Sequence, residues 1–151
     1  MSPDQYREAL QVHFDRFRRL LDSDPEEETN CKRKLVRCWA FTAYEEDGEL
    51  TKVLKANNGS NYICSNEVGN CGCAHAETRV ILGLMKTQVP GPFVLLVNYS
   101  PCSNCANLIV DSKLIIAVAY RHVTEHDKRG LAILQKNSIL DVQISERHES
   151  V

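Results

Sequence analysis

The chain has 151 residues, of which 43% are hydrophobic, and its formal net charge is −2 at pH 7. This length suits one domain with one core, and the composition is ordinary for a soluble globular protein. No apolar run approaches the ~20 residues that a membrane helix needs, so we expect no membrane partner. The charge gives no global attraction to a polyanion, although a local basic groove remains compatible with it.

The first segment predicts a helix over residues 3–21. Ser2-Pro3 fits a helix start, because proline is tolerated at the first helical position. Five apolar residues then recur at helical spacing and should pack on a sheet: Tyr6, Leu10, Phe14, Phe17 and Leu21. The N-terminus is polar and mixed in charge, so we expect no secretory signal and an intracellular location.

The rest of the chain predicts strands that alternate with helices, in a core of about residues 33–146. The expected strands cover residues 35–43, 50–54, 93–97, 114–120 and 140–144. The expected helices cover residues 74–86, 102–112 and a segment through Leu131 and Leu134. Thr124 and Asp127 resemble a capping box for the last of these helices. In the helix over 74–86, four residues should face inward: Val80, Ile81, Leu84 and Met85.

This order of elements indicates an α/β protein with a single domain over residues 1–151. Alternating βα units favour one mixed five-stranded sheet with helices on both faces. The connection from Tyr120 to Leu140 is long enough for a crossover helix. The last two strands should therefore be parallel rather than a hairpin.

Two short motifs supply metal-binding and proton-transferring groups, His75-Ala76-Glu77 and Pro101-Cys102-Ser103-Asn104-Cys105. Each motif starts a predicted helix, and cysteines three residues apart lie on one helical face, so both thiolates can reach one ion. One imidazole and two thiolates can hold one Zn²⁺ and leave its fourth position for water. Glu77 is too close to His75 along the chain to be a natural ligand. We expect Glu77 to move protons to and from that water.

The remaining cysteines leave alternatives open. The seven cysteines are an odd number without an export signal, which favours a reduced compartment and a metal site over a disulfide framework. Cys71 and Cys73 lie directly before the first motif and could add ligands or form a local disulfide. A structural zinc site made of these two with Cys102 and Cys105 is the alternative, but it would leave His75 and Glu77 without a purpose.

The two motifs resemble the H-x-E…P-C-x-x-C signature of the cytidine deaminase superfamily. Over about residues 35–145 the resemblance is greatest to its AID/APOBEC-like branch. Residues 99–106 are similar to that branch's Trp-Ser-Pro-Cys-x-x-Cys-Ala, with Tyr99 in place of the tryptophan. The resemblance implies the cytidine-deaminase-like fold and zinc-dependent conversion of cytosine to uracil.

The resemblance also implies four residues that surround the base. Ala76 would offer its backbone N–H to the base carbonyl, and Ser100 would offer its backbone carbonyl to the exocyclic amine. Tyr99 would form an aromatic wall of the pocket, which Tyr120 would close. The plain alternative for Tyr120 is that it is the last core residue of its strand.

Four further residues would contact the rest of the substrate. Asn57, with Asn58 as the alternative, would hold the sugar. Arg121 and His122 fall where the family reads the neighbouring nucleotide. The loop after Asn57 would line a groove for a nucleic-acid strand. The basic residues near it in sequence would contribute to the same groove: Lys32, Arg33, Lys34, Arg37, Lys52 and Lys55.

The expected substrate is cytosine in single-stranded DNA or RNA. Tyr99 in place of tryptophan, and the acidic balance, favour a free cytosine nucleotide as the enzyme alternative, because strong single-strand binders are basic and rich in exposed aromatics. Deoxycytidylate deaminases share the same zinc motif. A different class is an inactive deaminase-fold module that binds nucleic acid or assembles with a partner, but an intact Glu77 argues against it. The sequence makes no prediction of the oligomeric state.

Overall fold

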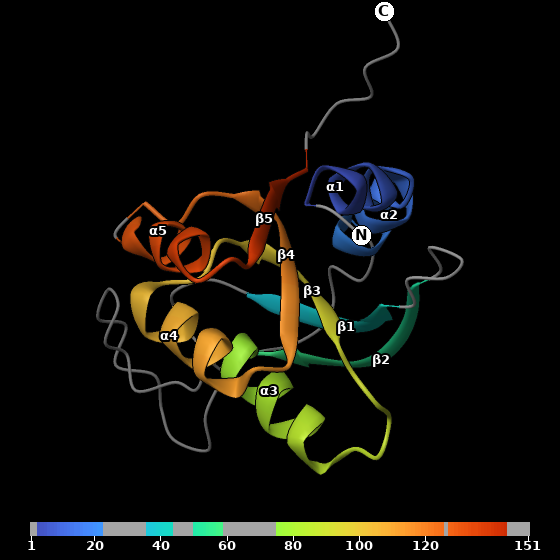
Figure 1. Ribbon diagram of the computed structural model, residues 1–151, viewed down its shortest axis with the longest axis horizontal. Helices are drawn as coiled ribbons and strands as arrows, with labels where there is room; N and C mark the ends of the chain where they lie inside the picture. Colours follow the sequence, from blue (N-terminus) through green and yellow to red (C-terminus); the bar gives the residue numbers. More distant parts are fainter. Residues whose placement is uncertain (1–2, 23–35, 44–49, 59–74, 126, 145–151) are drawn as a thin grey trace, which may run out of the picture.

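The computed structural model describes residues 3–22, 36–43, 50–58, 75–125 and 127–144 (Figure 1). The helices of this part of the chain are α1 (Pro3–Gln11), α2 (Phe14–Asp22), α3 (Ala76–Lys86), α4 (Ser103–Ser112) and α5 (Arg129–Lys136). The strands are β1 (Arg37–Ala43), β2 (Leu50–Asn57), β3 (Phe93–Tyr99), β4 (Ile115–His122) and β5 (Leu140–Gln143). Among the described residues, no helix has the length and apolar character needed to cross a membrane.

One mixed sheet, in the order β2-β1-β3-β4-β5, forms the centre of the molecule. β1 is antiparallel to both β2 and β3, whereas β3, β4 and β5 are parallel to one another. Helices α4 and α5 are the crossovers that parallel neighbours require. The predicted single-domain α/β fold, with a five-stranded mixed sheet and parallel last strands, is confirmed.

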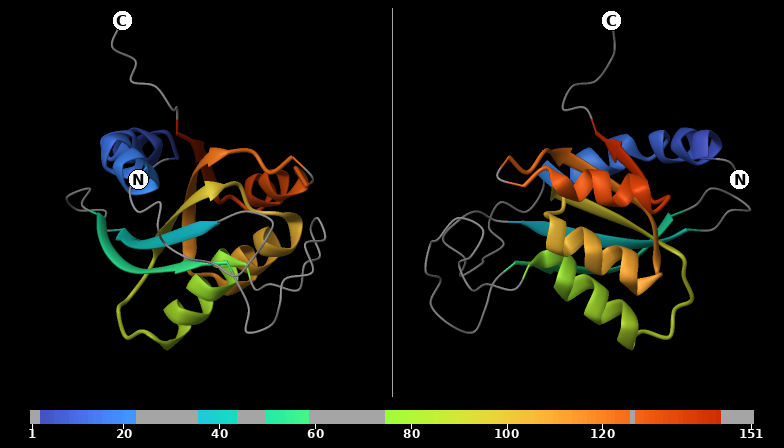
Figure 2. Two further views of the ribbon diagram at one scale, coloured as in Figure 1. Left: turned by 180° about the vertical axis from the view of Figure 1, so that it is seen from behind. Right: turned by 60° about the vertical axis from the view of Figure 1, so that its left-hand side comes forward.

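The sheet separates two apolar cores, because successive side chains of a strand point to opposite faces. On β1, Cys38 and Ala40 belong to the core beneath α3, α4 and α5. Their neighbours Trp39 and Phe41 belong to the core beneath α1 and α2. Figures 1 and 2 show the two N-terminal helices on one side of the sheet and α3 with α4 on the other. The prediction of helices on both faces is confirmed.

The segment expected to be one helix over residues 3–21 forms two helices. The His13 amide donates to the carbonyl of Leu10 at 2.9 Å, which closes a tight turn, and α2 then begins. Leu10, Phe17 and Leu21 are all buried in the same core, as the apolar stripe predicts. The bend therefore leaves residues of both helices in one core.

The inward face of α3 is narrower than expected. Val80, Ile81 and Leu84 are buried against the sheet, but the side chain of Met85 is 57% exposed. At about 100° per residue, Val80, Leu84 and Ile81 span an arc of roughly 100° around the helix axis. Met85 lies roughly 40° beyond the edge of that arc, toward solvent.

Candidate metal centre

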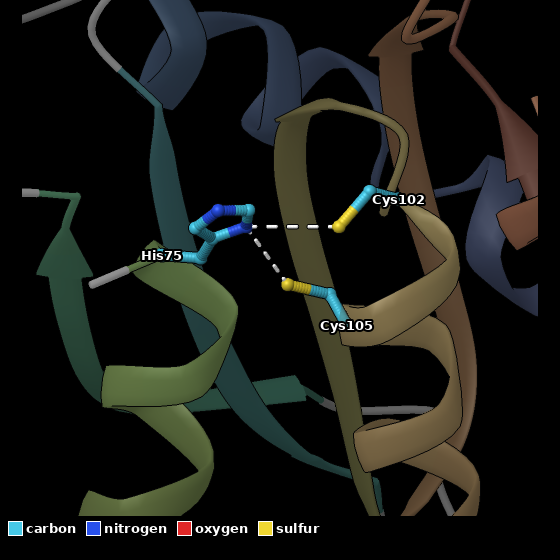
Figure 3. A group of neighbouring side chains, drawn as sticks. All are labelled: His75, Cys102 and Cys105. Atoms are coloured by element: carbon cyan, nitrogen blue, oxygen red, sulfur yellow. Dashed lines mark hydrogen bonds between the residues drawn. The ribbon is translucent and has the colours of Figure 1, made fainter. Parts of the chain in front are cut away.

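His75, Cys102 and Cys105 converge at the N-terminal ends of two neighbouring helices (Figure 3). His75 is the N-cap residue of α3, and Cys102 is the N-cap residue of α4, with Cys105 one turn further on. The His75 Nδ1 atom lies 3.1 Å from the Cys105 sulfur and 3.7 Å from the Cys102 sulfur. All three potential ligand atoms lie within 4.8 Å of one another.

The donor set and its separations suit Zn²⁺. Imidazole nitrogen and thiolate sulfur bind zinc at about 2.0–2.3 Å, so two ligand atoms on one tetrahedral ion lie roughly 3–4 Å apart. The His75–Cys105 and His75–Cys102 separations, 3.1 and 3.7 Å, are in this range. The group therefore fits one Zn²⁺ per chain, as the sequence predicts, and leaves a fourth position for a small molecule.

The pKa values of the two thiols are shifted in opposite directions. Hydrogen bonds from the Cys105 thiol and from His75 lower the pKa of Cys102 to about 4. The pKa of Cys105 is raised, mainly because its proton is held in the bond to Cys102 and because the thiol is buried. A hydrogen bond with the Thr78 side chain acts the other way on Cys105. Helix N-termini favour negative charge, so both positions suit thiolate ligands.

Glu77 is buried directly beside this group, in the first turn of α3. Burial raises the pKa of its carboxyl group to about 7, against the lowering effects of its backbone hydrogen bond and of His75. A carboxyl group with a pKa near neutrality can both take up and release a proton at pH 7. Cys38, on β1 beneath Glu77, has a raised pKa because it is buried and because the Glu77 charge is close.

The residues predicted to surround a base lie around the same edge of the sheet. Ala76 is the first residue of α3, where helix geometry leaves the backbone N–H without an intrahelical partner. The Ser100 carbonyl accepts the Thr124 hydroxyl, and its second lone pair remains for another donor. Tyr99 is the last residue of β3. Tyr120 lies two residues before the end of β4 and is 5% exposed. The roles of these four residues stay predictions.

The two candidate asparagines have different environments. The Asn58 Oδ1 atom accepts the backbone N–H of Val36 at 2.8 Å, and the backbone N–H of Asn58 donates to the Val36 carbonyl at 3.0 Å. The Asn57 Oδ1 atom is buried and has no hydrogen-bond partner among the described residues. A buried acceptor without a partner is uncommon and suggests a missing donor. Asn58 therefore has a structural bond, and Asn57 is the better candidate for a substrate contact.

Arg121 and His122 lie on opposite faces of β4. The His122 ring contacts the Tyr99 ring, with centroids 5.2 Å apart, at the edge near the metal-binding group. The Arg121 guanidinium instead pairs with Asp22 of α2 at 2.7 Å. Both residues border an open hollow of about 610 Å³ that begins at Tyr99 and runs past Val123. Their predicted contact with a neighbouring nucleotide stays a prediction.

Thr124 and Asp127, after β4, have contacts beyond the helix that they were expected to cap. That helix, α5, begins at Arg129, and the Asp127 carboxylate accepts the Arg129 amide at 3.2 Å. The Thr124 amide donates to Ser100 Oγ at 2.8 Å. The Asp127 carboxylate accepts the Ser103 amide at 3.0 Å and so caps α4. The only sequence signal for this arrangement was the cluster of helix-capping residue types.

Part of the predicted site lies outside the described residues. This applies to the basic run Lys32-Arg33-Lys34, and to Cys71 and Cys73. Lys55 is described, and its amino group lies 5.1 Å from the centre of the Trp39 ring. Trp39 belongs to the core beneath α1 and α2, so Lys55 lies on the face of the sheet away from the metal-binding group.

Solved structures share this fold. The dCMP deaminase of the cyanophage S-TIM5, solved with dCMP and dUMP, is similar over 95% of this chain and 98% of its own, with 22% identity and a TM-score of 0.61. The Rib2 deaminase of Aspergillus oryzae is similar over 95% of this chain and 85% of its own, with 15% identity and a TM-score of 0.53. A diaminohydroxyphosphoribosylaminopyrimidine deaminase/5-amino-6-(5-phosphoribosylamino)uracil reductase from Thermotoga maritima is similar over 87% of this chain but only 37% of its own, with 17% identity and a TM-score of 0.58. At these identities the likeness establishes the fold alone.

Sequence comparison gives the family. No curated protein sequence matches the chain. Residues 33–121, more than half of the chain, match the family model of the cytidine and deoxycytidylate deaminase zinc-binding region. That segment contains His75, Glu77, Cys102 and Cys105, which are the residues assembled at the candidate metal centre. The chain therefore belongs to the family defined by the cytidine and deoxycytidylate deaminase zinc-binding region.

Proposed function

We propose that this protein deaminates the cytosine ring of a free nucleotide by hydrolysis, with deoxycytidylate as the first substrate to test. The observation that carries the proposal is the buried Glu77 beside a zinc-type group of one imidazole and two thiols. When bound, zinc supplies an activated water at a site held by His75, Cys102 and Cys105. The family model and the whole-chain likeness to a phage dCMP deaminase support this substrate class.

Glu77 has the proton-transfer role. Water adds to C4 of the ring and ammonia leaves, so one proton must reach the ring nitrogen and another the departing amine. A buried carboxyl group with a pKa of about 7 can take each proton and deliver it. The Ala76 N–H, at the start of α3, would orient the base carbonyl, and the Ser100 carbonyl would orient the amine.

Two observations favour a free nucleotide over a polynucleotide. Lys55, which was expected to line a groove for a strand, lies over Trp39 on the other face of the sheet. Arg121, which was expected to read a neighbouring base, is paired with Asp22. Both cations therefore have protein partners, so they contribute less to the salt-dependent attraction that holds a polynucleotide.

Cytosine in single-stranded DNA or RNA is the second candidate. The likeness of residues 99–106 to the AID/APOBEC-like branch supports it, as does the open hollow that begins at Tyr99 and passes His122. A hollow next to the base-binding residues is large enough for a neighbouring nucleotide. In this case His122 is the residue that would contact the adjoining base.

The test compares two substrates. Zinc-loaded protein is incubated with dCMP and, separately, with a cytosine-containing single strand, and uracil is measured in each. Turnover of dCMP alone supports the proposal, and turnover of the strand alone supports the second candidate. Failure on both, by a protein that holds one zinc, would favour the inactive binding module.

A variant pair tests the role of Glu77. Glu77→Gln keeps the size of the side chain but cannot carry a proton, so we expect about one zinc per chain and a rate at least about 100-fold lower. Asp111→Asn makes the same chemical change at an exposed position of α4 and should keep the wild-type rate. Undiminished turnover by Glu77→Gln would remove Glu77 from the mechanism.

A further inference from the structure

Asp127 holds the start of helix α4, next to the ligand residue Cys102. One oxygen of the Asp127 carboxylate accepts both the backbone amide of Ser103, at 3.0 Å, and the Ser103 hydroxyl, at 2.7 Å. The other oxygen accepts the Arg129 amide at 3.2 Å and its Nε at 3.0 Å. The carboxylate is thus oriented from the α5 side and presents its second oxygen to α4.

The two ligand cysteines depend on their surroundings to different degrees. Cys105 lies inside the first turn of α4, so the helix itself fixes its backbone. Cys102 precedes the helix, with an extended backbone and no side-chain capping bond, although its carbonyl accepts the Ala106 amide at 2.8 Å. Its thiol is therefore positioned by the contacts of the residues on either side of it. The Asp127–Ser103 pair is the contact that immediately follows Cys102 in the chain.

A second contact comes from the same loop and holds the residues before Cys102. The Thr124 amide donates to Ser100 Oγ at 2.8 Å, and the Thr124 hydroxyl donates to the Ser100 carbonyl. Ser100 is 2% exposed and Thr124 is 5% exposed, so water competes little for these bonds. The chain after β4 therefore contacts the ligand segment on both sides of the cysteine.

The charge of Asp127 is stable over the useful pH range. Hydrogen bonds from Arg129 and Ser103 hold the pKa of Asp127 well below its ordinary value. The side chain is only 11% exposed, although its partner Arg129 is 79% exposed. A carboxylate near a helix N-terminus also interacts favourably with the helix dipole.

We propose that Asp127 is a positioning residue for the metal centre, because it fixes the first amide of α4 and thereby the place of the Cys102 thiolate. The inference rests on the proposed function only in taking Cys102 as a zinc ligand. It assigns no contact between Asp127 and the substrate. Its consequence is that loss of Asp127 should loosen the metal rather than the sheet.

The experiment measures zinc release from the folded protein. Holoprotein is mixed with an excess of a colorimetric zinc chelator, and the rate is followed for wild type, Asp127→Ala and Asp127→Asn. Loss of an outer partner of a metal ligand costs roughly 10–100-fold in metal affinity, so Asp127→Ala should release zinc about 10-fold faster. Asp127→Asn keeps an oxygen that can accept the Ser103 amide, so it should lie nearer to wild type.

Two controls separate positioning from general loss of stability. Val142→Ala removes two methyl groups from the core beneath α1 and α2, on the far face of the sheet from the metal centre. It should lower the unfolding midpoint while leaving the zinc release rate unchanged. Asp111→Ala removes an exposed carboxylate near the other end of α4 and should change neither quantity. Cobalt(II)-substituted protein gives a second readout, because a displaced Cys102 alters the thiolate charge-transfer band.

The outcomes are distinct from those of the substrate test. A wild-type release rate and an unchanged cobalt spectrum for Asp127→Ala would overturn the inference. Equal acceleration by Val142→Ala would also overturn it, because the effect would then follow stability alone. A wild-type protein that holds zinc but deaminates neither dCMP nor a strand would refute the proposed function and leave the metal measurements valid.

Discussion

The backbone of Gly130, at the start of α5, lies so close to Pro101 that a Cβ atom on Gly130 would overlap the Pro101 carbonyl oxygen. The obstacle is backbone, which cannot rotate away as a side chain can. We expect Gly130→Ala to lower the free energy of unfolding by at least about 2 kcal/mol, because overpacking at an unyielding site costs roughly 1–3 kcal/mol or more. Urea unfolding of wild type and variant measures the difference.

Gly83 in α3 is the matched control for this substitution. A Cβ there would lie 3.1 Å from Leu54 Cδ2, which is the end of a flexible side chain. Alanine in a helix interior gains about 1 kcal/mol over glycine, which offsets a small shift of Leu54. Gly83→Ala should therefore remain within about 1 kcal/mol of wild type. Equal destabilisation by both variants would contradict the close approach of Gly130 to Pro101.

The two adjacent asparagines should separate stability from activity. Asn58→Ala removes the acceptor of the part-buried Val36 amide, and a shielded donor left without a partner costs about 1–3 kcal/mol. Asn57→Ala removes an acceptor that has no partner among the described residues, so stability should change by less than about 0.5 kcal/mol. Its KM for the substrate should rise by about 5–10-fold if a substrate hydroxyl donates to Asn57. A purely structural Asn57 would give the opposite ranking of the two variants.

Zinc removal should destabilise the folded protein. A ligand that binds only the folded state contributes about 2.7 kcal/mol when its concentration is 100 times its dissociation constant. We expect dialysis against a chelator to lower Tm and restored zinc to recover it. Cys102→Ala should have the Tm of the metal-free protein with and without added zinc, because only two of the three ligand residues remain to hold the ion. A Tm of wild type that does not respond to zinc would show that the metal is not coupled to folding.

Acid should reduce the stability contributed by Asp127. Hydrogen bonds from Arg129 and Ser103 keep the folded-state pKa of this carboxyl below its unfolded value of about 3.9. A depressed folded-state pKa gives stability that is complete above the unfolded pKa and is lost as pH falls through the folded one. The difference in unfolding free energy between wild type and Asp127→Asn should therefore be constant from pH 7 to about 5 and narrow below about pH 4. Denaturant titrations across this range test it, and a gap that widens in acid would reverse the assigned sign.

The sheet and the metal centre were predictable because their signals are local. Buried strands of the central sheet appear as apolar runs, and the connection before Leu140 can only be a crossover. Cys102 and Cys105 are three residues apart, a spacing that suits one helical face, and His75 and Glu77 were recognised from the H-x-E motif that begins the preceding helix. The two motifs then meet because they begin the neighbouring helices α3 and α4.

The contacts that were not predictable join distant parts of the chain. Arg121 pairs with Asp22 across 99 residues, and no local pattern marks that choice. Asp127 was read as a cap for the helix that follows it, because capping residues are recognised by their distance to the next apolar run. In the structure it accepts the first amide of α5 and also the first amide of α4. The contact with α4 depends on tertiary packing, which residue type alone does not reveal.

The chain order of the metal centre has a consequence during synthesis. The three ligand residues emerge from the ribosome before Thr124 and Asp127 do, and before β4 can pair with β3. A nascent chain of that length carries the imidazole and both thiols without the contacts that hold Cys102 in place. From the proposed role of Asp127, we expect lasting capture of the ion only after the start of α5 has emerged, and any metal bound earlier should exchange more readily.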